Sequence, residues 1–582
     1  MAPLDRSSYS LHAAALLTYS VLAIVMTFPL ALHLGDSLIA VDSSGLNDAY
    51  LTVWIFGWGA HQLITDPLSL FHGNIFYPFE NTLAFSEIIL PGTLLYLPFA
   101  YATGNPVLAH NLVVLLSFPL SAFAVYLFAA DWLATTNDSQ HEGHPVPKAT
   151  TEAPRAALIA GLIFGFCTFR MGELRHVQLL MAMFMPLTLM YLARFMRIPS
   201  LHNALCTAAF FVLNALASLY YGIFLAFAVA LQVAVDCARR RFRYSRAHFV
   251  YGAAALVVAA VFVLPFALRY LQLEHEHHFS GTRDPRLVSA RPASYLAAPA
   301  AQWLYGNLTH AFYVASKGQP LFPGVIALAL SVAGLVASVR EKDRSWVFPA
   351  LLALMGFVLS FGPFLILNRR VIPAFPFPLP YYFLSLVVSP LRGVGAPARF
   401  AVLTMLGSSL LAARGACVLL RFAPDRARVI AIVGAALLLT EYVVVPVRLE
   451  RVAAGGDVSP VYALLARQPR GQVVVEVPMG APTYGGQNKY AVYTYNSLVH
   501  GLPLINGYSG FIPREYYELV SEMQAFPSGG TVERLSKWGA YWIVVHADRY
   551  KDRNELRQRL AQLDGIERVQ DFGAIWLYRL RR

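Results

Sequence analysis

The sequence has 582 residues, of which 57% are hydrophobic and only 13% are charged, and its mean hydropathy is +0.52. Soluble domains carry about 25% charged residues, so this composition excludes an ordinary soluble protein and predicts a polytopic α-helical membrane protein. The net charge of +12 is scattered along the chain, a distribution that does not favour nucleic-acid binding. The cysteines show no metal-ligand spacing and predict no disulfide framework; they are Cys167, Cys206, Cys237 and Cys417.

Apolar segments of membrane-spanning length run through the first three quarters of the chain. The first, 11–34, lacks a small-residue cleavage site, so we expect it to remain as a helix. We interpret 204–236 as a single span, although Leu219-Tyr-Tyr-Gly222 inside it is a candidate break. About eleven spans of roughly 20 residues result, at 11–34, 86–104, 106–133, 156–171, 177–198, 204–236, 248–268, 321–339, 346–367, 399–420 and 429–447.

Basic clusters orient these spans. Three clusters lie between spans of the later half, at 239–243, 340–344 and 421–428, and the positive-inside rule makes their side cytoplasmic. The unsplit span 204–236 then places residues 170–176 inside, whereas a break would place them outside. Under the unsplit scheme the N-terminus lies inside. The loops 35–85, 269–320 and 368–398, and everything after 448, are expected outside.

The first external loop, Gly35 to Glu87, is acidic and contains no Lys or Arg. Asp48 precedes an aromatic run with helical spacing, which predicts a short helix on the membrane surface with Trp54 and Trp58 at the interface. A carboxylate at the start of such a helix lies near its positive dipole end and stays ionised. Asp48 is therefore the leading candidate for a catalytic base and Asp36 the second, with an acidic solvated loop as the alternative.

Two more groups of candidates lie in the later external loops. The run Glu274, His275, Glu276, His277 and His278 has the residue types that bind divalent metals. Consecutive residues point in different directions, however, so a solvated loop is the alternative and no cofactor is assigned.

Arginines on the external side form the other group. External loops are normally poor in Lys and Arg, so these residues call for a reason. The guanidinium fork matches phosphate oxygens, and a lipid-linked phosphate is one reason. Long loops that escape the rule are the alternative. The candidates for binding a donor phosphate are Arg283, Arg286, Arg392 and Arg399.

The chain changes character near residue 447. Residues 448–582 mix polar and apolar patterns and predict a separate α/β domain outside the membrane. The turn-rich stretch Asn506 to Phe511 is interpreted as a connector, with a sugar-contacting lid as the alternative. Strands are expected at 473–478, 541–546 and 574–578, and helices at 513–523 and 552–563.

These features together resemble the GT-C class of integral-membrane glycosyltransferases, which use polyprenyl-phosphate sugars as donors. The resemblance covers residues 11 to about 447 and rests on the acidic first loop, the long loop between spans seven and eight, and an external C-terminal domain. Its local pattern is similar to that of bacterial members of the class, and it implies that Asp48 is the catalytic base. The local pattern consists of Gly35-Asp36, Asn47-Asp48, Trp54, Trp58, Asp66-Pro67 and Asn74 to Pro78, followed by His176-Val-Gln178 and Pro186-Leu187.

The function expected from these observations is inverting transfer of a sugar from a polyprenyl-phosphate donor to a lipid, glycan or protein acceptor. The site would face the outer side of a bacterial cytoplasmic membrane. The sequence contains no P-loop, GxSxG, HExxH or CxxC pair, so the external loops must build the site. The alternatives are a transporter or lipid-flipping protein, and a non-catalytic assembly protein for envelope polysaccharide.

Overall fold

The computed structural model describes residues 6–40, 46–138, 152–240, 244–277, 284–367, 377–388, 391, 395–480 and 490–581. The chain divides into two compact units. Unit 1 contains Met1–Leu32 and Val114–Val447, and unit 2 contains His33–Val113 and Arg448–Arg582. The acidic first loop, 35–87, therefore belongs to the same unit as the C-terminal segment.

Unit 1 is helical, and by length and composition the described residues contain six helices able to cross a membrane. Shorter apolar helices accompany them, which confirms a polytopic, mostly helical protein. The longer helices are α1 (Arg6–Met26), α4 (Pro106–Asp138), α5 (Glu152–Phe166), α8 (Phe184–Arg197), α9 (Leu201–Ala217), α10 (Leu219–Arg240), α11 (Arg246–His277), α13 (Val325–Arg340), α14 (Val347–Ser360), α17 (Ala401–Phe422) and α18 (Ala427–Tyr442).

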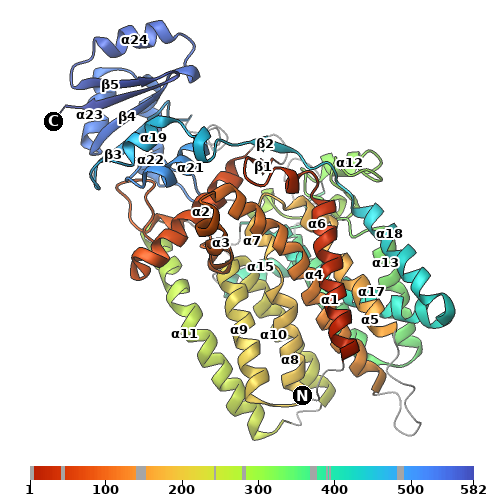
Figure 1. Ribbon diagram of the computed structural model, residues 1–582. Coiled ribbons are helices and arrows are strands. Elements are labelled where there is room, and N and C mark those ends of the chain that lie inside the picture. Colours follow the sequence, from red (N-terminus) through yellow and green to blue (C-terminus); the bar gives the residue numbers. More distant parts are fainter. Residues whose placement is uncertain are drawn as a thin grey trace. The chain divides into compact units, whose positions relative to one another are not determined.

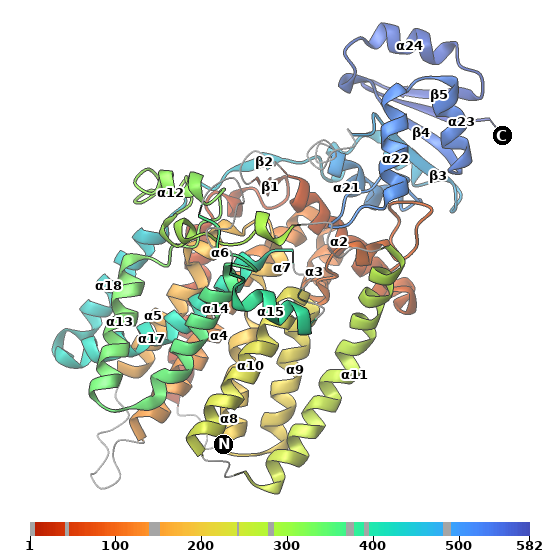
Figure 2. The ribbon, with the colours of Figure 1, turned by 180° about the vertical axis from the view of Figure 1, so that it is seen from behind.

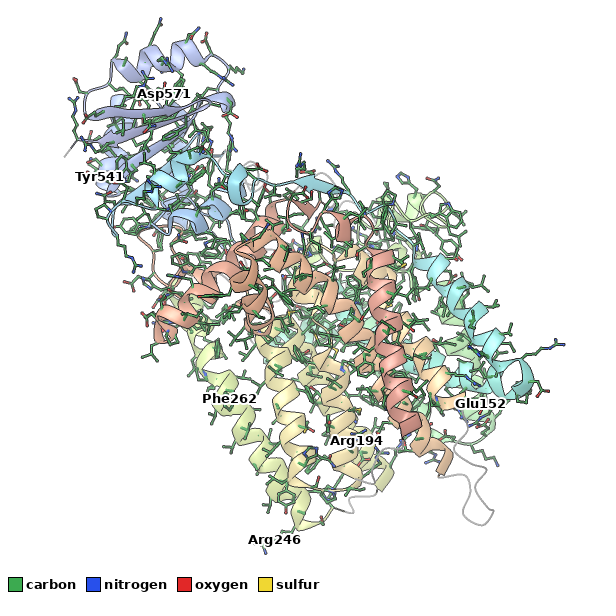
Figure 3. The ribbon with its side chains drawn as sticks, in the orientation of Figure 1. Glu152, Arg194, Arg246, Phe262, Tyr541 and Asp571 are labelled. Carbon is green, nitrogen blue, oxygen red and sulfur yellow. The ribbon has the colours of Figure 1, made fainter. Side chains whose placement is uncertain are left out.

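Helix α17 lies at the centre of unit 1 and packs against α5, α13 and α14. Small residues allow this approach: a Cβ atom at Gly334 or Gly415 would collide with the backbone of the facing helix. Helix α11 is the opposite case, because its apolar surface is exposed. Phe262, labelled in Figure 3, is 57% exposed there. Such a face is suited to lipid.

Short helices gather at one end of unit 1. They are α6 (Thr168–Gly172), α7 (Val177–Leu180), α12 (His310–Ala315) and α15 (Pro380–Val387). Figure 2 shows them at the end away from the α8–α9 and α10–α11 connections.

The interpretation of 204–236 as one span is wrong. Ser218, in extended conformation (φ −153°, ψ 123°), separates α9 from α10. Arg194 near the end of α8 and Arg246 at the start of α11 lie toward the same end of unit 1 (Figure 3), so the segment between them crosses the unit twice. Hydropathy did not reveal the break because both sides of it are apolar.

The expected span 86–104 is also wrong. The chain forms only α3 (Leu90–Thr103), which has 14 residues, includes Pro98 and packs against α2 within unit 2. Ile89 has the left-handed conformation (φ 48°), so the helix begins only at Leu90, after the start of the expected span. A membrane core needs about 20 helical residues, so α3 is too short to cross one.

Unit 2 combines helices of the first loop with a mixed sheet (Figure 1). The sheet has four strands in the order β3-β4-β6-β5. β3 is parallel to β4, and the other neighbours are antiparallel. The three expected strands and two expected helices are confirmed; β5 was missed because its sequence is polar and its side chains are largely exposed. The elements are β1 (Ser37–Ile39), α2 (Asn47–Thr65), β2 (Leu449–Arg451), α19 (Pro460–Leu465), β3 (Val473–Val477), α21 (Ala491–His500), α22 (Arg514–Glu522), α23 (Gly529–Lys537), β4 (Ala540–His546), α24 (Arg553–Ala561), β5 (Ile566–Phe572) and β6 (Ile575–Leu580).

The core of unit 2 joins residues from the two ends of the chain. β1 pairs with β2, and α2 packs along α21. Removing this apolar surface from water is what holds α2 in place. The buried cluster contains Leu38, Ala40, Leu46, Ala49, Val53, Val107, Val452 and Tyr495.

Candidate functional site

Asp48 lies in the first turn of α2 and is half-buried. One of its carboxylate oxygens, Oδ1, accepts a hydrogen bond of 2.9 Å from the hydroxyl of Tyr508, 460 positions along the chain. One turn further along α2, Thr52 Oγ1 lies 3.0 Å from His110 Nε2. Residues four apart share a helix face, so Asp48 has polar neighbours on its own side of α2.

The loop that carries Tyr508 is held tightly. The side chain of Asn506 accepts from the Glu476 N–H at 2.7 Å and donates to the Glu476 carbonyl at 2.9 Å. The Tyr508 N–H donates to Thr494 Oγ1 at 3.1 Å. A Cβ atom at Gly507 would lie 2.5 Å from the ring of Phe76, so only glycine fits there. The stretch interpreted as a connector therefore places a hydroxyl on Asp48.

Behind this site lies the buried side chain of Glu476, which is paired with His546. His546 Nε2 lies 2.6 Å from Glu476 Oε2, and the Tyr462 hydroxyl donates to the same oxygen at 2.7 Å. Glu476 and Tyr508 are thus linked through Asn506, so the sheet of unit 2 supports the loop over Asp48.

Helix α2 is a core helix, which corrects the expected surface helix. Trp54 is fully buried, and its indole N–H donates to Asn74 Oδ1 at 3.0 Å. Trp58 is half-buried and donates to the His72 carbonyl at 2.7 Å. The same spacing of aromatic residues is expected for a helix on the membrane surface and for a helix that another part of the same chain covers.

Asp36, the second candidate, has different surroundings. Its carboxylate is 42% exposed and lies 3.5 Å from His33 and 3.7 Å from Arg451. The Ser37 hydroxyl donates to it at 3.0 Å. These contacts are those of a surface ion pair beside the β1–β2 ladder.

The Glu/His run falls at the end of α11. Glu274 to Glu276 continue that helix, and Gln272 donates to Glu276 at 2.9 Å. His277 ends the helix, and His278 lies outside the described residues. Among the residues that the structure describes, no group of three or more His, Cys, Asp or Glu side chains is arranged to hold a metal ion.

The structure describes two of the four arginines that were candidates for binding a donor phosphate. Arg283 and Arg392 lie outside the described residues. Arg286 is 44% exposed and paired with Asp284 at 2.8 Å. Arg399 is half-buried in the turn Pro397–Phe400, with its guanidinium 5.0 Å from the ring centre of Tyr220.

The structure brings the charge of Arg399 to act on Glu173, a residue that sequence reasoning treated only as part of a topology marker. Glu173 lies in the connection between α6 and α7, and its carboxylate is 2.5 Å from Nδ1 of His176. Burial would raise the pKa of Glu173, but His176, Arg399 and Arg175 together hold it below its ordinary value. The available signal was the charge density of 170–176 beside the His176-Val-Gln178 pattern.

The solved structure of the arabinofuranosyltransferase AftD from Mycobacteria matches this chain with a TM-score of 0.58 and 15% sequence identity. The match covers 98% of this chain and 41% of AftD. The chain has the fold of GT-C glycosyltransferases. ArnT from Cupriavidus metallidurans bound to undecaprenyl phosphate also matches, with a TM-score of 0.49 and 14% identity, over 98% of this chain and 97% of ArnT. The sequence matches no protein-family model and no curated protein.

Proposed function

We propose that this protein is an inverting glycosyltransferase that takes a sugar from a polyprenyl-phosphate donor. The acceptor is a lipid, glycan or protein at the outer side of a bacterial cytoplasmic membrane. The fold shared with AftD over nearly the whole chain supports the enzyme class.

The surroundings of Asp48 are the observation that carries the mechanism. A general base must be ionised, oriented and accessible to the acceptor hydroxyl. Asp48 is at a helix N-terminus, is oriented by the Tyr508 hydroxyl at 2.9 Å, and is only half-buried. Asp36 instead forms exposed ion pairs. Of these two carboxylates, Asp48 is therefore the better candidate for the base.

The proposed reaction forms one bond and breaks one. The acceptor oxygen attacks the anomeric carbon from the face opposite the phosphate, and its proton passes to the Asp48 carboxylate. The bond between the anomeric carbon and the phosphate oxygen breaks, and its electron pair stays on the phosphate. Arginine guanidinium groups are suited to stabilising that developing charge.

Transport has weaker support, because Arg170 and Glu441, two ionisable residues inside or beside the apolar helices, bind backbone groups of unit 1. Arg170 donates to the carbonyls of Gly165, Leu180 and Ser117. Both carboxylate oxygens of Glu441 accept backbone N–H groups at the start of α13, each at 3.0 Å. These contacts satisfy backbone groups that a helix end leaves open.

The test is Asp48→Asn in the purified full-length protein. The amide oxygen can still accept the Tyr508 hydrogen bond, but the group no longer takes a proton. A general base contributes about 10²- to 10⁴-fold in rate, so transfer should fall by at least about 100-fold. The measurement is transfer of radiolabelled sugar from polyprenyl-phosphate donors, alongside the melting temperature.

Two other variants are measured alongside Asp48→Asn. Asp66→Asn changes an exposed turn residue of the same loop and should keep the parent's rate. Asp36→Asn tests the second candidate directly. Parental transfer by Asp48→Asn would refute the assignment of the base. Full activity in both Asp48→Asn and Asp36→Asn would exclude a carboxylate base at either position.

A further inference from the structure

A short segment of unit 2, Pro503 to Asn506, joins the sheet to the first loop. It lies along the outer edge of β3, where the Val474 N–H donates to the Pro503 carbonyl at 2.8 Å and the Ile505 N–H donates to the Val474 carbonyl at 2.9 Å. On its other side, main-chain hydrogen bonds of 2.7 to 3.1 Å join it to residues 74–77 of the first loop. The segment therefore covers an edge of the sheet and fixes the first loop against it.

At Asn506 a side chain takes over from the main chain along β3. Asn506 Oδ1 accepts from the Glu476 N–H at 2.7 Å, and Nδ2 donates to the Glu476 carbonyl at 2.9 Å. A primary amide offers a donor and an acceptor as a peptide group does, so the edge of β3 stays paired. The main chain can leave that edge, and two residues later the Tyr508 hydroxyl reaches Asp48. Asn506 is 4% exposed, so loss of its side chain would leave buried backbone groups unpaired.

The residue that Asn506 binds is itself held by a buried polar network. Glu476 is fully buried, and its Oε2 lies 2.6 Å from Nε2 of His546 and accepts from the Tyr462 hydroxyl at 2.7 Å. The His546 ring is stacked on Tyr493, with 4.8 Å between ring centres. A buried carboxylate is costly unless such partners satisfy it. These contacts fix the point of β3 to which Asn506 is attached.

Helix α21 holds Tyr508 from the other side. Thr494 Oγ1 accepts from the Tyr508 N–H at 3.1 Å. Two residues further on, Asn496 Nδ2 donates to the Tyr462 hydroxyl at 2.8 Å, so the same helix also contacts the network around Glu476. The main chain is thus fixed immediately before and after Gly507, and the direction of the Tyr508 side chain follows from it.

We propose that Asn506 is a positioning residue for the reaction, which holds the Tyr508 hydroxyl on the Asp48 carboxylate, and that the Glu476–His546 pair anchors it. This rests on the proposed function, because Asp48 is the proposed base. It adds that side chains within the sheet of unit 2 control the orientation of that base. Asn506 is buried and acts through Tyr508, so its loss should lower kcat and leave the KM for the donor unchanged.

A double-mutant cycle in the purified full-length protein tests this coupling. Asn506→Ala should lower kcat about tenfold, because the hydrogen bond to the charged Asp48 is lost with the orientation of Tyr508. In the Tyr508→Phe background the same change should cost less than about twofold, because the hydroxyl that Asn506 orients is already absent. A tenfold loss in both backgrounds would mean that Asn506 serves the fold alone, and would overturn the proposal. Asn554→Ala, the same change at an exposed position of α24, should transfer as the parent does.

Two variants at His546 test the anchor. The side-chain nitrogen of glutamine can take the place of Nε2 and donate to Glu476, whereas that of asparagine lies too close to the main chain. His546→Gln should therefore keep kcat within about twofold of the parent, and His546→Asn should lower it as Asn506→Ala does. Equal rates in the two variants would remove the anchoring role from this pair.

Hydrogen exchange of the same proteins gives a readout that needs no transfer. In Asn506→Ala the amides of 503–511 should exchange at least about tenfold faster, and those of β4 should keep the parent's rates. Unchanged exchange in 503–511 would overturn the proposal, and so would faster exchange in β4, because Asn506 would then support the whole sheet. If the parent transfers no sugar, the proposed function fails, and exchange still decides whether Asn506 holds the segment that carries Tyr508.

Discussion

At the scale of single residues, the hydrogen bond from the Tyr508 hydroxyl distinguishes Asp48 from Asp36, the other candidate for the base. A hydroxyl that donates to a carboxylate stabilises its ionised form and fixes its direction. The 2.9 Å bond is supported from behind by Asn506 and Thr494, so Tyr508 has little freedom to move. We regard Tyr508 as a positioning residue that acts through Asp48.

Tyr508→Phe removes this hydroxyl and keeps the ring in its pocket. Transfer at neutral pH should fall about tenfold, the value of a hydrogen bond to a charged group. The acidic limb of the pH–rate profile should move toward higher pH, because the protonated carboxylic acid is now relatively favoured. The profile of kcat/KM from pH 5 to pH 9 measures both effects. A slower enzyme whose profile keeps the parent's shape would mean that Tyr508 serves packing alone.

At the scale of elements, helix α21 ends at His500, whose burial opposes the usual preference for a positive charge at a helix C-terminus. A cation at a helix C-terminus gains about 0.3–1 kcal/mol from the dipole. His500 is nevertheless 5% exposed, and burial lowers its pKa from 6.5 to about 3. Its Nδ1 accepts the Leu502 N–H at 3.0 Å, a bond that needs the neutral ring. Burial outweighs the dipole here because a desolvated charge costs several times the dipole's gain.

This histidine should make the protein sensitive to acid. The folded-state pKa lies below the unfolded value, so the stabilisation is complete above pH 6.5 and is lost as the pH falls from there toward about 3. Between pH 7 and pH 5 the loss is about 2 kcal/mol, at about 1.4 kcal/mol per pH unit. His500→Asn keeps an acceptor near the position of Nδ1 and should melt with a shallower dependence on pH. Melting temperatures of parent and variant that fall in parallel between pH 7 and pH 5 would contradict this.

At the scale of the whole molecule, two errors in the expected spans offset each other. One expected span is the short helix α3 of unit 2, and another is the pair α9 and α10. Under the positive-inside rule, the expected number of spans and the expected internal position of the N-terminus are the same either way. What changes is the expected side of the connections between them: residues 173–176 are now expected on the outer side, and the α8–α9 connection is now expected on the inner side.

Labelling of single cysteines in intact cells tests this orientation. The native Cys167, Cys206, Cys237 and Cys417 are first replaced by serine. Ile198→Cys, 70% exposed beside the α8–α9 connection, should resist an impermeant maleimide, because the positive-inside rule predicts that connection to be cytoplasmic. Leu308→Cys, 75% exposed, and Lys551→Cys in unit 2 should react. Labelling of Ile198→Cys would restore the topology with an unbroken 204–236, and protection of Lys551→Cys would reverse the whole orientation.

The sequence by itself determined the features that depend on local composition. Long apolar runs need no partner to be recognised as membrane helices, and short runs of β-branched and aromatic residues predict β3 and β4 within a few positions. The tertiary structure alone decided which distant residues meet. Tyr508 forms a hydrogen bond with Asp48 across 460 positions. The charge of Arg399 acts on Glu173 from a distant part of the sequence. It also decided the break at Ser218 and the burial of Trp54. Side chains of the same apolar character suit lipid and protein interior equally, so only packing against a particular neighbour separates the two.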